Sequence, residues 1–278
     1  MAIQNSAVLI DLNISVYTGR KLDKKVSQEI DMDKHTQGSA GNYHKKLYGK
    51  DSKLDKLQKL VGMIRTWHYE QTLPWSDGGS RLLPMANFFD YKAQLGEYEK
   101  LFNEEVKEFL TEYPLLTTAA AFQLGDLFNA DDYPPIDRIE GKFGFRFAFF
   151  PVPESGDFRI DVNEAAKAEL EAQYQSYTQT KLNAAMKDVW DRLHEVLQHM
   201  SDKLAGEEKQ LFRDTLVSNA VEMCELLTKL NVTSDPKLEL MRKKVESALV
   251  GVTPKDLRKD EDLREDVKSK VDEILSMF

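Results

Sequence analysis

The chain has 278 residues, 41% of them hydrophobic, which is enough to bury the core of one large domain or two small ones. Its formal net charge of −9 excludes a protein that coats nucleic acid with its whole surface, because phosphate binding depends mainly on Lys and Arg. The charge is uneven, since residues 1–85 hold 13 Lys and Arg against 9 Asp and Glu. The acidic excess therefore lies after residue 85, and the two ends differ electrostatically.

The sequence shows no sign of export or membrane insertion. The lone cysteine, Cys224, cannot form an intramolecular disulfide, and no apolar run reaches the roughly 18 to 20 residues needed to span a bilayer. The first residues do not combine a basic segment with an apolar one, as a secretion signal does. We expect a cytoplasmic protein with cytoplasmic partners and no membrane contact.

Residues 8–17 alternate between two sets of side chains and predict a strand with one buried face. Thr18–Gly19 ends this strand. Residues 20–50 are polar and are broken by three glycines. We therefore expect a mobile connection there, with at most a short helix near residues 24–30.

A helix is predicted from about Asp51, with Asp51 or Ser52 as its N-terminal cap and with Pro74 ending it. Its apolar face follows the spacing of three and four residues that is typical of one helical face. That face consists of Leu54, Leu57, Val61, Ile64 and His68. Residues 77–80 then predict a turn, and residues 81–84 an edge strand or an extended link.

The next predicted helix runs from Asn87 to Tyr113 and has a heptad pattern. The residues that recur every seven positions are Phe88, Leu95, Phe102 and Phe109. The short connection favours an antiparallel hairpin with the previous helix. We expect Pro114 to end it, since the residue before proline disfavours the helical region.

A second strand signal follows a brief helix predicted over residues 117–129. Residues 143–150 place a Phe at every second position, and residues 151–156 turn the chain back into a strand at 157–160. We expect this hairpin to join the strand at 8–17 in a small antiparallel sheet.

Beyond residue 162 the pattern is helical. One long helix has a seam formed by Leu182, Met186, Val189, Leu193, Val196 and Met200. Further helices are predicted over residues 207–230, 235–251 and 255–278. The predicted fold class is α+β, mainly α, with long helical hairpins packed with a small antiparallel sheet. We expect a sheet-plus-hairpin part over residues 1–161 and a helical region over residues 162–278.

No metal-binding pattern is complete in the sequence. His194 and His199 are five residues apart, which on a helix separates them by about 140 degrees, so they cannot share one ion. Asp31, Asp33 and His35 alternate, but they lack the further ligands and the glycine of a calcium loop. We predict no metal site.

Patterns for catalysis and nucleotide binding are also incomplete. The chain has neither a full Gly-rich phosphate loop nor a Gly-x-Ser-x-Gly elbow. Asp131–Asp132 precedes two prolines and predicts a helix end, and Cys224 lies among apolar residues, where a thiol is usually a small buried hydrophobe. We predict a protein that is not an enzyme and has no cofactor.

A basic stretch with interleaved aromatic residues lies between Arg20 and Arg65. Its candidate contact residues are Arg20, Lys21, Lys45, Lys46, Tyr48, Lys50, Lys53, Lys56 and Lys59. Such a mixture suits single-stranded nucleic acid, whose phosphates attract cations and whose bases stack on rings. Two other interpretations stay open: a solvated helix flank whose Lys stems cover apolar surface, and a contact with an acidic protein.

Several of these segments together match the pattern of a known family. They are residues 14–21 (Ile-Ser-Val-Tyr-Thr-Gly-Arg-Lys), the helix around 57–67, residues 81–84 (Arg-Leu-Leu-Pro), the helix end at 108–113 and the Phe-rich strand before Pro151. In these segments the chain resembles a family of phage and integrative-element proteins named domain of unknown function 3150. Tyr17 stands where the family pattern often has Trp.

The resemblance implies a companion of DNA replication or recombination genes, in some elements beside a MoxR-like AAA+ ATPase with a von Willebrand A partner. It assigns no catalytic residue. We therefore predict a non-enzymatic adaptor or scaffold of a phage or mobile element, acting in DNA metabolism or host takeover in the bacterial cytoplasm. The heptads add a prediction of self-association. The alternatives are a single-stranded nucleic acid binding protein that uses the Arg20 to Arg65 region, and an enzyme of unrecognised type.

Overall fold

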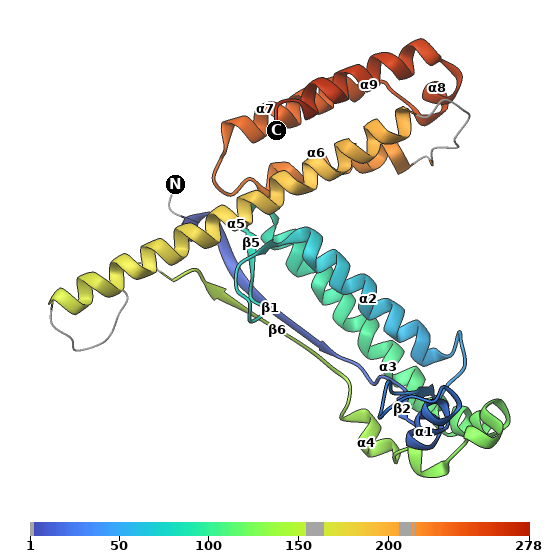
Figure 1. Ribbon diagram of the computed structural model, residues 1–278. Helices are drawn as coiled ribbons and strands as arrows, with labels where there is room; N and C mark the ends of the chain where they lie inside the picture. Colours follow the sequence, from blue (N-terminus) through green and yellow to red (C-terminus); the bar gives the residue numbers. More distant parts are fainter. Residues whose placement is uncertain (1–2, 154–163, 206–212, 214) are drawn as a thin grey trace. The chain divides into compact units, whose positions relative to one another are not determined.

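The computed structural model describes residues 3–153, 164–205, 213 and 215–278 (Figure 1). As predicted, the chain is an α+β protein that is mainly α. The strands are β1 Ala7–Ser15, β2 Arg20–Leu22, β3 His44–Lys46, β4 Leu73–Pro74, β5 Arg81–Pro84 and β6 Gly144–Pro151. The helices are α1 Lys24–Asp33, α2 Lys53–Gln71, α3 Phe88–Leu124, α4 Ile136–Glu140, α5 Glu164–Leu204, α6 Thr215–Leu230, α7 Pro236–Leu249, α8 Pro254–Lys259 and α9 Glu261–Leu275.

A four-stranded sheet has the order β4-β5-β1-β6 and contains the three predicted strands β1, β5 and β6. β1 and β5 are antiparallel, with Ala7 opposite Pro84. The two-residue strand β4 was not predicted, because it is too short to show alternation. It forms because a turn closed by the Ser76 N–H and the Ser80 carbonyl, 3.0 Å apart, returns the chain to β5. The strand predicted at 157–160 lies outside the described residues.

The contacts of the chain divide it into two compact units. Unit 1 comprises residues 1–11, 69–91 and 148–278, and unit 2 comprises residues 12–68 and 92–147. The elements β1, α2, α3 and β6 each begin in one unit and end in the other. The units therefore follow a different division from the boundary predicted between residues 161 and 162.

The core of unit 1 forms where α5 packs against α6, α9 and β4. Val189, Leu193 and Met200 of the predicted seam are fully buried, while Leu197 is buried in place of the half-exposed Val196. The single helix predicted over residues 255–278 is two helices. Asp260 has extended dihedral angles, and its side chain accepts a hydrogen bond from the Leu263 N–H at 3.0 Å, which caps α9.

Two arginines cap the C-terminal end of α2 within unit 1. Arg192 donates to the carbonyls of Tyr69, Glu70 and Thr72 at 2.8 to 3.0 Å. Arg81 donates to the Thr72 hydroxyl at 2.7 Å and to the Thr72 carbonyl at 3.0 Å. Because the last carbonyls of a helix have no partner within it and carry partial negative charge, guanidinium groups are stabilising there. Burial and the neighbouring Arg192 charge lower the pKa of Arg81.

In unit 2, α2 and α3 lie side by side as the predicted antiparallel hairpin (Figure 1). The predicted face of α2 is buried, and its residues Leu57, Val61 and Ile64 share a cluster with Phe102 of α3. The cap of α2 is Ser52, whose Oγ accepts from the Asp55 N–H at 3.3 Å. The heptad residues of α3 pack inside the chain on Phe side chains of β6 and on Phe143, which directly precedes it. Ring centroids are 5.6 Å apart for Phe102–Phe145 and also 5.6 Å apart for Phe109–Phe143.

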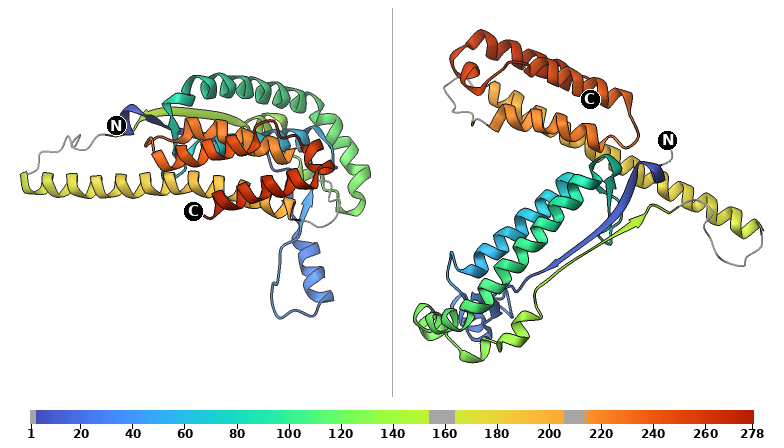
Figure 2. Two further views of the ribbon diagram at one scale, coloured as in Figure 1. Left: turned by 90° about the horizontal axis from the view of Figure 1, so that it is seen from above. Right: turned by 180° about the vertical axis from the view of Figure 1, so that it is seen from behind.

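α3 continues through Pro114, so the prediction that this proline ends the helix was wrong. A proline inside a helix removes one N–H donor and bends the helix. Pro114 is exposed, and the teal and green parts of α3 run in different directions (Figure 2). The Thr117 hydroxyl donates to the Tyr113 carbonyl at 3.0 Å and supports this turn. The separate helix predicted over residues 117–129 is the last part of α3 followed by short 3-10 turns.

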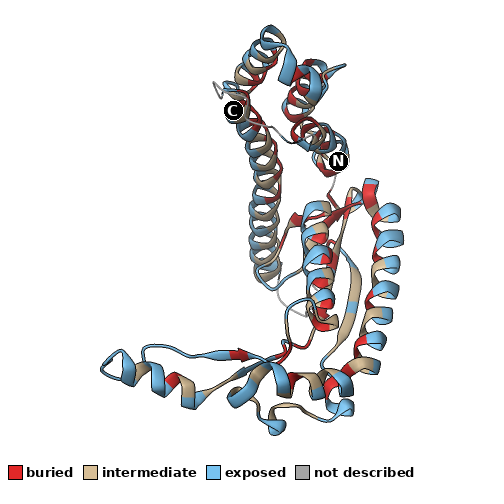
Figure 3. Cartoon of the chain, turned by 90° about the vertical axis from the view of Figure 1, so that its right-hand side faces the viewer, coloured by how far each residue is buried: buried red, intermediate tan, exposed pale blue. Residues whose placement is uncertain are grey.

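Within residues 20–50, α1 is the short helix that was expected near residues 24–30. The strands β2 and β3 were not predicted, and they pair at the base of an arm that contains α1. The Ser27 hydroxyl donates to the Asp23 carbonyl at 2.7 Å and accepts from the Tyr43 N–H at 2.9 Å. These bonds connect the start of α1 to the strand that returns. The outer part of the arm is largely exposed (Figure 3). Both strands have three residues, too few to show a pattern.

Candidate anion-binding site

The nine candidate contact residues of the basic stretch divide into two groups. Lys45 and Tyr48 are buried, Lys53 pairs with Glu108, Lys59 pairs with Asp55 at 2.8 Å, and Lys21 lies 3.9 Å from Asp132. The others are Arg20, Lys46, Lys50 and Lys56, which are exposed. Within the described part of the chain, no acidic oxygen lies within 4.0 Å of these four cations.

Lys45 is not a surface cation, because its side chain is only 6% exposed. Its Nζ lies 2.8 Å from an Asp132 carboxylate oxygen and 3.3 Å from one of Asp23, and it donates to the Leu127 carbonyl at 2.6 Å. Burial lowers the pKa of Lys45, but the hydrogen bonds to Asp132 and Asp23 outweigh burial and raise it above its usual value. This ammonium group joins β3 to Asp23, Leu127 and Asp132, and it is not available to a ligand.

Tyr48 belongs to an aromatic core and not to a stacking surface. Its ring, 8% exposed, lies with its centroid 5.8 to 6.4 Å from those of Tyr17, Phe109, Tyr113 and Tyr133. Burial, followed by the Tyr113 hydroxyl, raises the pKa of Tyr48. One edge of the ring lines the pocket described below.

The β2–β3 ladder places cations directly opposite each other on both of its faces. Arg20 is opposite Lys46, and Lys21 is opposite Lys45. Like charges directly opposite on paired strands are destabilising. On the Lys21–Lys45 face the Asp132 carboxylate offsets the charge, being 2.8 Å from Lys45 and 3.9 Å from Lys21. The Arg20–Lys46 face has no acid at such a distance among the described residues.

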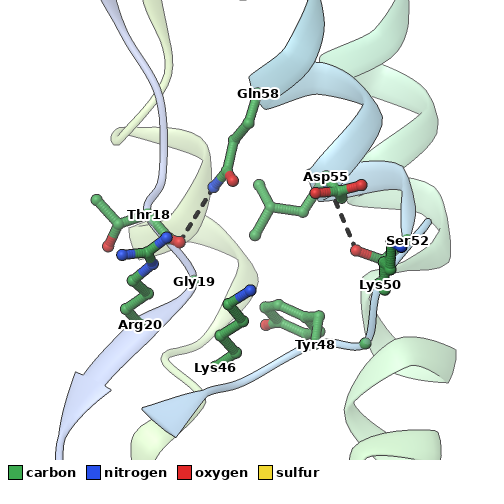
Figure 4. A pocket seen from close by; sticks show the side chains of 11 residues that line it. Thr18, Gly19, Arg20, Lys46, Tyr48, Lys50, Ser52, Asp55 and Gln58 are labelled. Atoms are coloured by element: carbon green, nitrogen blue, oxygen red, sulfur yellow. Dashed lines mark hydrogen bonds between the residues drawn. The ribbon is translucent and has the colours of Figure 1, made fainter. Parts of the chain in front are cut away.

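The Arg20–Lys46 face borders a pocket of about 80 Å³ (Figure 4). Lys50 lies in the loop that leads to α2, and we call Arg20, Lys46 and Lys50 the pocket cations. The other lining residues are Thr18, Gly19, Tyr48, Gly49, Ser52, Leu54, Asp55 and Gln58.

Gly19 is required where the pocket meets the core. Its φ of +59° is in the left-handed region, and a Cβ there would lie 2.4 Å from Cδ2 of Leu54. Its carbonyl accepts from the Leu47 N–H at 2.8 Å, which extends the pairing of the two strands by one hydrogen bond. A side chain at this position would strain the backbone and fill space beside Leu54.

Two acceptors of this pocket that could repel an anion are already engaged, the Thr18 carbonyl and the Asp55 carboxylate. The Gln58 side-chain amide donates to the carbonyls of Tyr17 and Thr18 at 2.9 and 3.0 Å. Asp55 pairs with Lys59 at 2.8 Å, and hydrogen bonding to Lys59 holds the pKa of Asp55 below its usual value, with a smaller contribution from the Lys46 charge. The pocket therefore presents cations to solvent, and the charge of its one carboxylate is offset by Lys59.

The other residues considered for chemistry do not assemble. His194 is half-buried against the Phe278 ring, and His199 is exposed. Burial raises the pKa of the Cys224 thiol to about 12. In the part of the chain that the structure describes, no group of three or more His, Cys, Asp or Glu side chains is placed to hold a metal ion. No helix there is long and apolar enough to cross a membrane.

No known family model, curated protein or solved structure matches this chain. The resemblance to the phage and integrative-element family therefore stays a prediction from the sequence.

Proposed function

We propose that this protein is a non-enzymatic binding protein that contacts single-stranded nucleic acid through the pocket cations. The observation that carries the proposal is the cross-strand pair Arg20–Lys46, two exposed like charges with no acidic oxygen within 4.0 Å among the described residues. Phosphate groups would remove this repulsion, and Arg and Lys are the main phosphate ligands of nucleic acid binding proteins.

Residues around the pocket support a ligand longer than one phosphate. Lys56, exposed on the first turns of α2, is one more cation without an acid within 4.0 Å among the described residues. Tyr43 and His44, at the start of β3, expose their rings next to the ladder. Exposed rings beside a basic groove are where unpaired bases stack. Tyr43 and His44 would thus provide the stacking that was expected of Tyr48, whose ring is buried.

A fluorescence anisotropy titration tests the proposal. A labelled single-stranded oligonucleotide is titrated at several salt concentrations with wild type and with the Lys46→Gln/Lys50→Gln variant. In a plot of log affinity against log salt concentration, each lost phosphate contact should reduce the magnitude of the slope by about 0.7. The slope of the variant should therefore be smaller in magnitude by about 1.4.

Lys237→Gln/Lys255→Gln is the matched control, because it changes net charge equally at exposed residues in the first turns of α7 and α8. The control should bind as wild type does. Failure of wild type to bind at low salt, or an equal loss in the control, rejects the proposal.

A second function, as an adaptor for a protein partner, is favoured by the last part of α3. Leu115 and Phe122 are seven residues apart, so they share a helical face, and they are 71% and 87% exposed. Paired exposed apolar residues favour a protein contact. With the family resemblance, this supports a role in phage or mobile-element DNA metabolism in the bacterial cytoplasm, beside a partner such as the MoxR-like ATPase. Loss of a co-purifying partner in Leu115→Ser/Phe122→Ser, with unchanged circular dichroism, would be the expected result.

A further inference from the structure

We infer that the pocket cations bind a terminal phosphate monoester of the nucleic acid strand and not an internal phosphodiester. This inference rests on the proposed function and specifies its ligand. Three features of the pocket lead to it: the number of cations, the closed inner side of the space, and the state of its one acid.

The number of cations favours a doubly charged group. Arg20 and Lys46 project from paired strands, and Lys50 comes from the separate loop before α2, so that three positive charges border one small space (Figure 4). A phosphate monoester has a charge of about −1.5 to −2 near pH 7 and three strong acceptor oxygens. A phosphodiester has one negative charge and two free oxygens, so it can satisfy fewer of these donors.

The shape of the pocket favours the end of a strand. Gly19, the Tyr48 ring and Leu54 close the inner side. An internal phosphate has chain on both sides, and both segments would have to leave through the same opening. A terminal phosphate is followed by only one chain segment, so only that segment has to leave through the opening.

The acid of the lining does not compete with this ligand. The Asp55 carboxylate accepts from the Asp51 N–H at 3.3 Å and also pairs with Lys59. It is therefore already bound by groups other than the pocket cations. Ser52 at the rim uses its hydroxyl oxygen to accept from the Asp55 N–H, which leaves the hydroxyl proton as an additional donor for a phosphate oxygen.

The test uses the full chain and three oligonucleotides of one sequence, each with the same internal fluorescent label. They end in a 5′-hydroxyl, a 5′-phosphate or a 3′-phosphate. We expect a phosphorylated strand to bind wild type about tenfold more tightly than the hydroxyl strand, equivalent to about 1.4 kcal/mol. This preference should disappear in Lys46→Gln and persist in Lys21→Gln, whose side chain lies on the opposite face of the same ladder. Thermal melts by circular dichroism check that both variants fold.

The possible outcomes separate this inference from the proposed function. Equal binding of all three strands that still depends on Lys46 and Lys50 overturns end recognition and leaves nucleic acid binding intact. No binding of any strand at low salt overturns both. A phosphoserine peptide that binds wild type more tightly than the 5′-phosphorylated strand would assign the pocket to a phosphoprotein and overturn the inference as well. The comparison of strands on wild type needs no variant, so it holds even where a substitution impairs folding.

Discussion

Lys45 and Lys46 are neighbours in the sequence, yet they lie on opposite faces of β3 and should respond differently to the same change. Lys45→Met leaves the Asp132 and Asp23 carboxylates without their buried partner. Breaking a buried pair by removing one member costs about 3 to 5 kcal/mol of the free energy of unfolding. Lys46→Met removes an exposed side chain and should change it by less than about 0.5 kcal/mol. Urea unfolding followed by circular dichroism measures both. Equal effects would show that Lys45 is not buried with its partners.

Gly19 and Gly62 give a second pair of opposite expectations. Gly19→Ala places a methyl group 2.4 Å from Leu54 in a left-handed backbone, which should lower the free energy of unfolding by about 1 to 3 kcal/mol. Gly62 lies inside α2, where a Cβ meets nothing within 4 Å, so Gly62→Ala should raise it by about 0.5 to 1 kcal/mol. Thermal melts of both variants provide the measurement, and shifts of the same sign would contradict the geometry at Gly19.

Glu239 should make stability depend on pH in acid. The Arg242 guanidinium donates to both of its carboxylate oxygens, at 2.7 and 2.8 Å, and these hydrogen bonds lower the pKa of Glu239 to about 2 from 4.5. A depressed folded-state pKa stabilises the fold fully above the unfolded pKa, and this contribution is lost as pH falls from about 4.5 to about 2. The carboxylate is 39% exposed, so the contribution is at most about 1 kcal/mol.

The comparison with Glu239→Gln isolates this contribution. Urea unfolding at a series of pH values should show wild type slightly more stable at pH 7, with the difference shrinking through the acid range. A difference that does not change with pH would mean that the Arg242 pair does not lower the pKa of this carboxyl group.

At the scale of elements, the helices and strands that can be predicted from the sequence are those in which buried residues recur periodically over many positions. The faces of α2 and α3 and the Phe alternation of β6 repeat often enough to stand out, and each is packed in the structure. β2, β3 and β4 have two or three residues each, and they form because of pairing with another strand, across a tight turn for β4 and across the arm for β2 and β3. α3 passes Pro114 because packing along the rest of a 37-residue helix outweighs one missing hydrogen bond.

The candidate site was only partly predictable, because β2 and β3 are too short to show a pattern in the sequence. Composition indicates a basic stretch but cannot say which face of an unpredicted strand each lysine occupies. Once β3 is known, the period of two assigns Lys45 and Leu47 to the buried side and Lys46 to the exposed side. Gly19 was predicted only to end the first strand, and Gln58 gave no signal, because their roles in the pocket depend on contacts with Leu54 and with backbone carbonyls.

The heptads of α3 and α5 led to a prediction of self-association, and the structure gives these seams partners inside the chain. Phe102 packs on Phe145 of β6, Phe109 packs on Phe143 just before β6, and Val189 and Leu193 lie in the core of unit 1. They therefore offer no argument for a dimer. Light scattering at tens of micromolar still measures the oligomeric state directly.

At the scale of the whole molecule, the interleaving of the two units predicts which fragments fold. A fragment of residues 162–278 keeps the packing of α5 with α6 and α9 and of α7 with α6 and α9. It should therefore be helical and melt cooperatively. A fragment of residues 1–161 lacks α5, which packs on β4, and so loses most of the core cluster to which Leu73 and Leu82 belong. With this apolar surface exposed, it should aggregate or lose the sheet, although it contains all of unit 2.

Circular dichroism melts of the two fragments, with size-exclusion chromatography, measure this difference. The control is the full chain at equal concentration. A fragment 1–161 that is monomeric and melts as cooperatively as the full chain would show that the sheet does not need α5. The predicted boundary between residues 161 and 162 would then be a true domain boundary. If instead only fragment 162–278 melts cooperatively, unit 2 does not fold without residues 162–278, although β1, α2, α3 and β6 each have residues in both units.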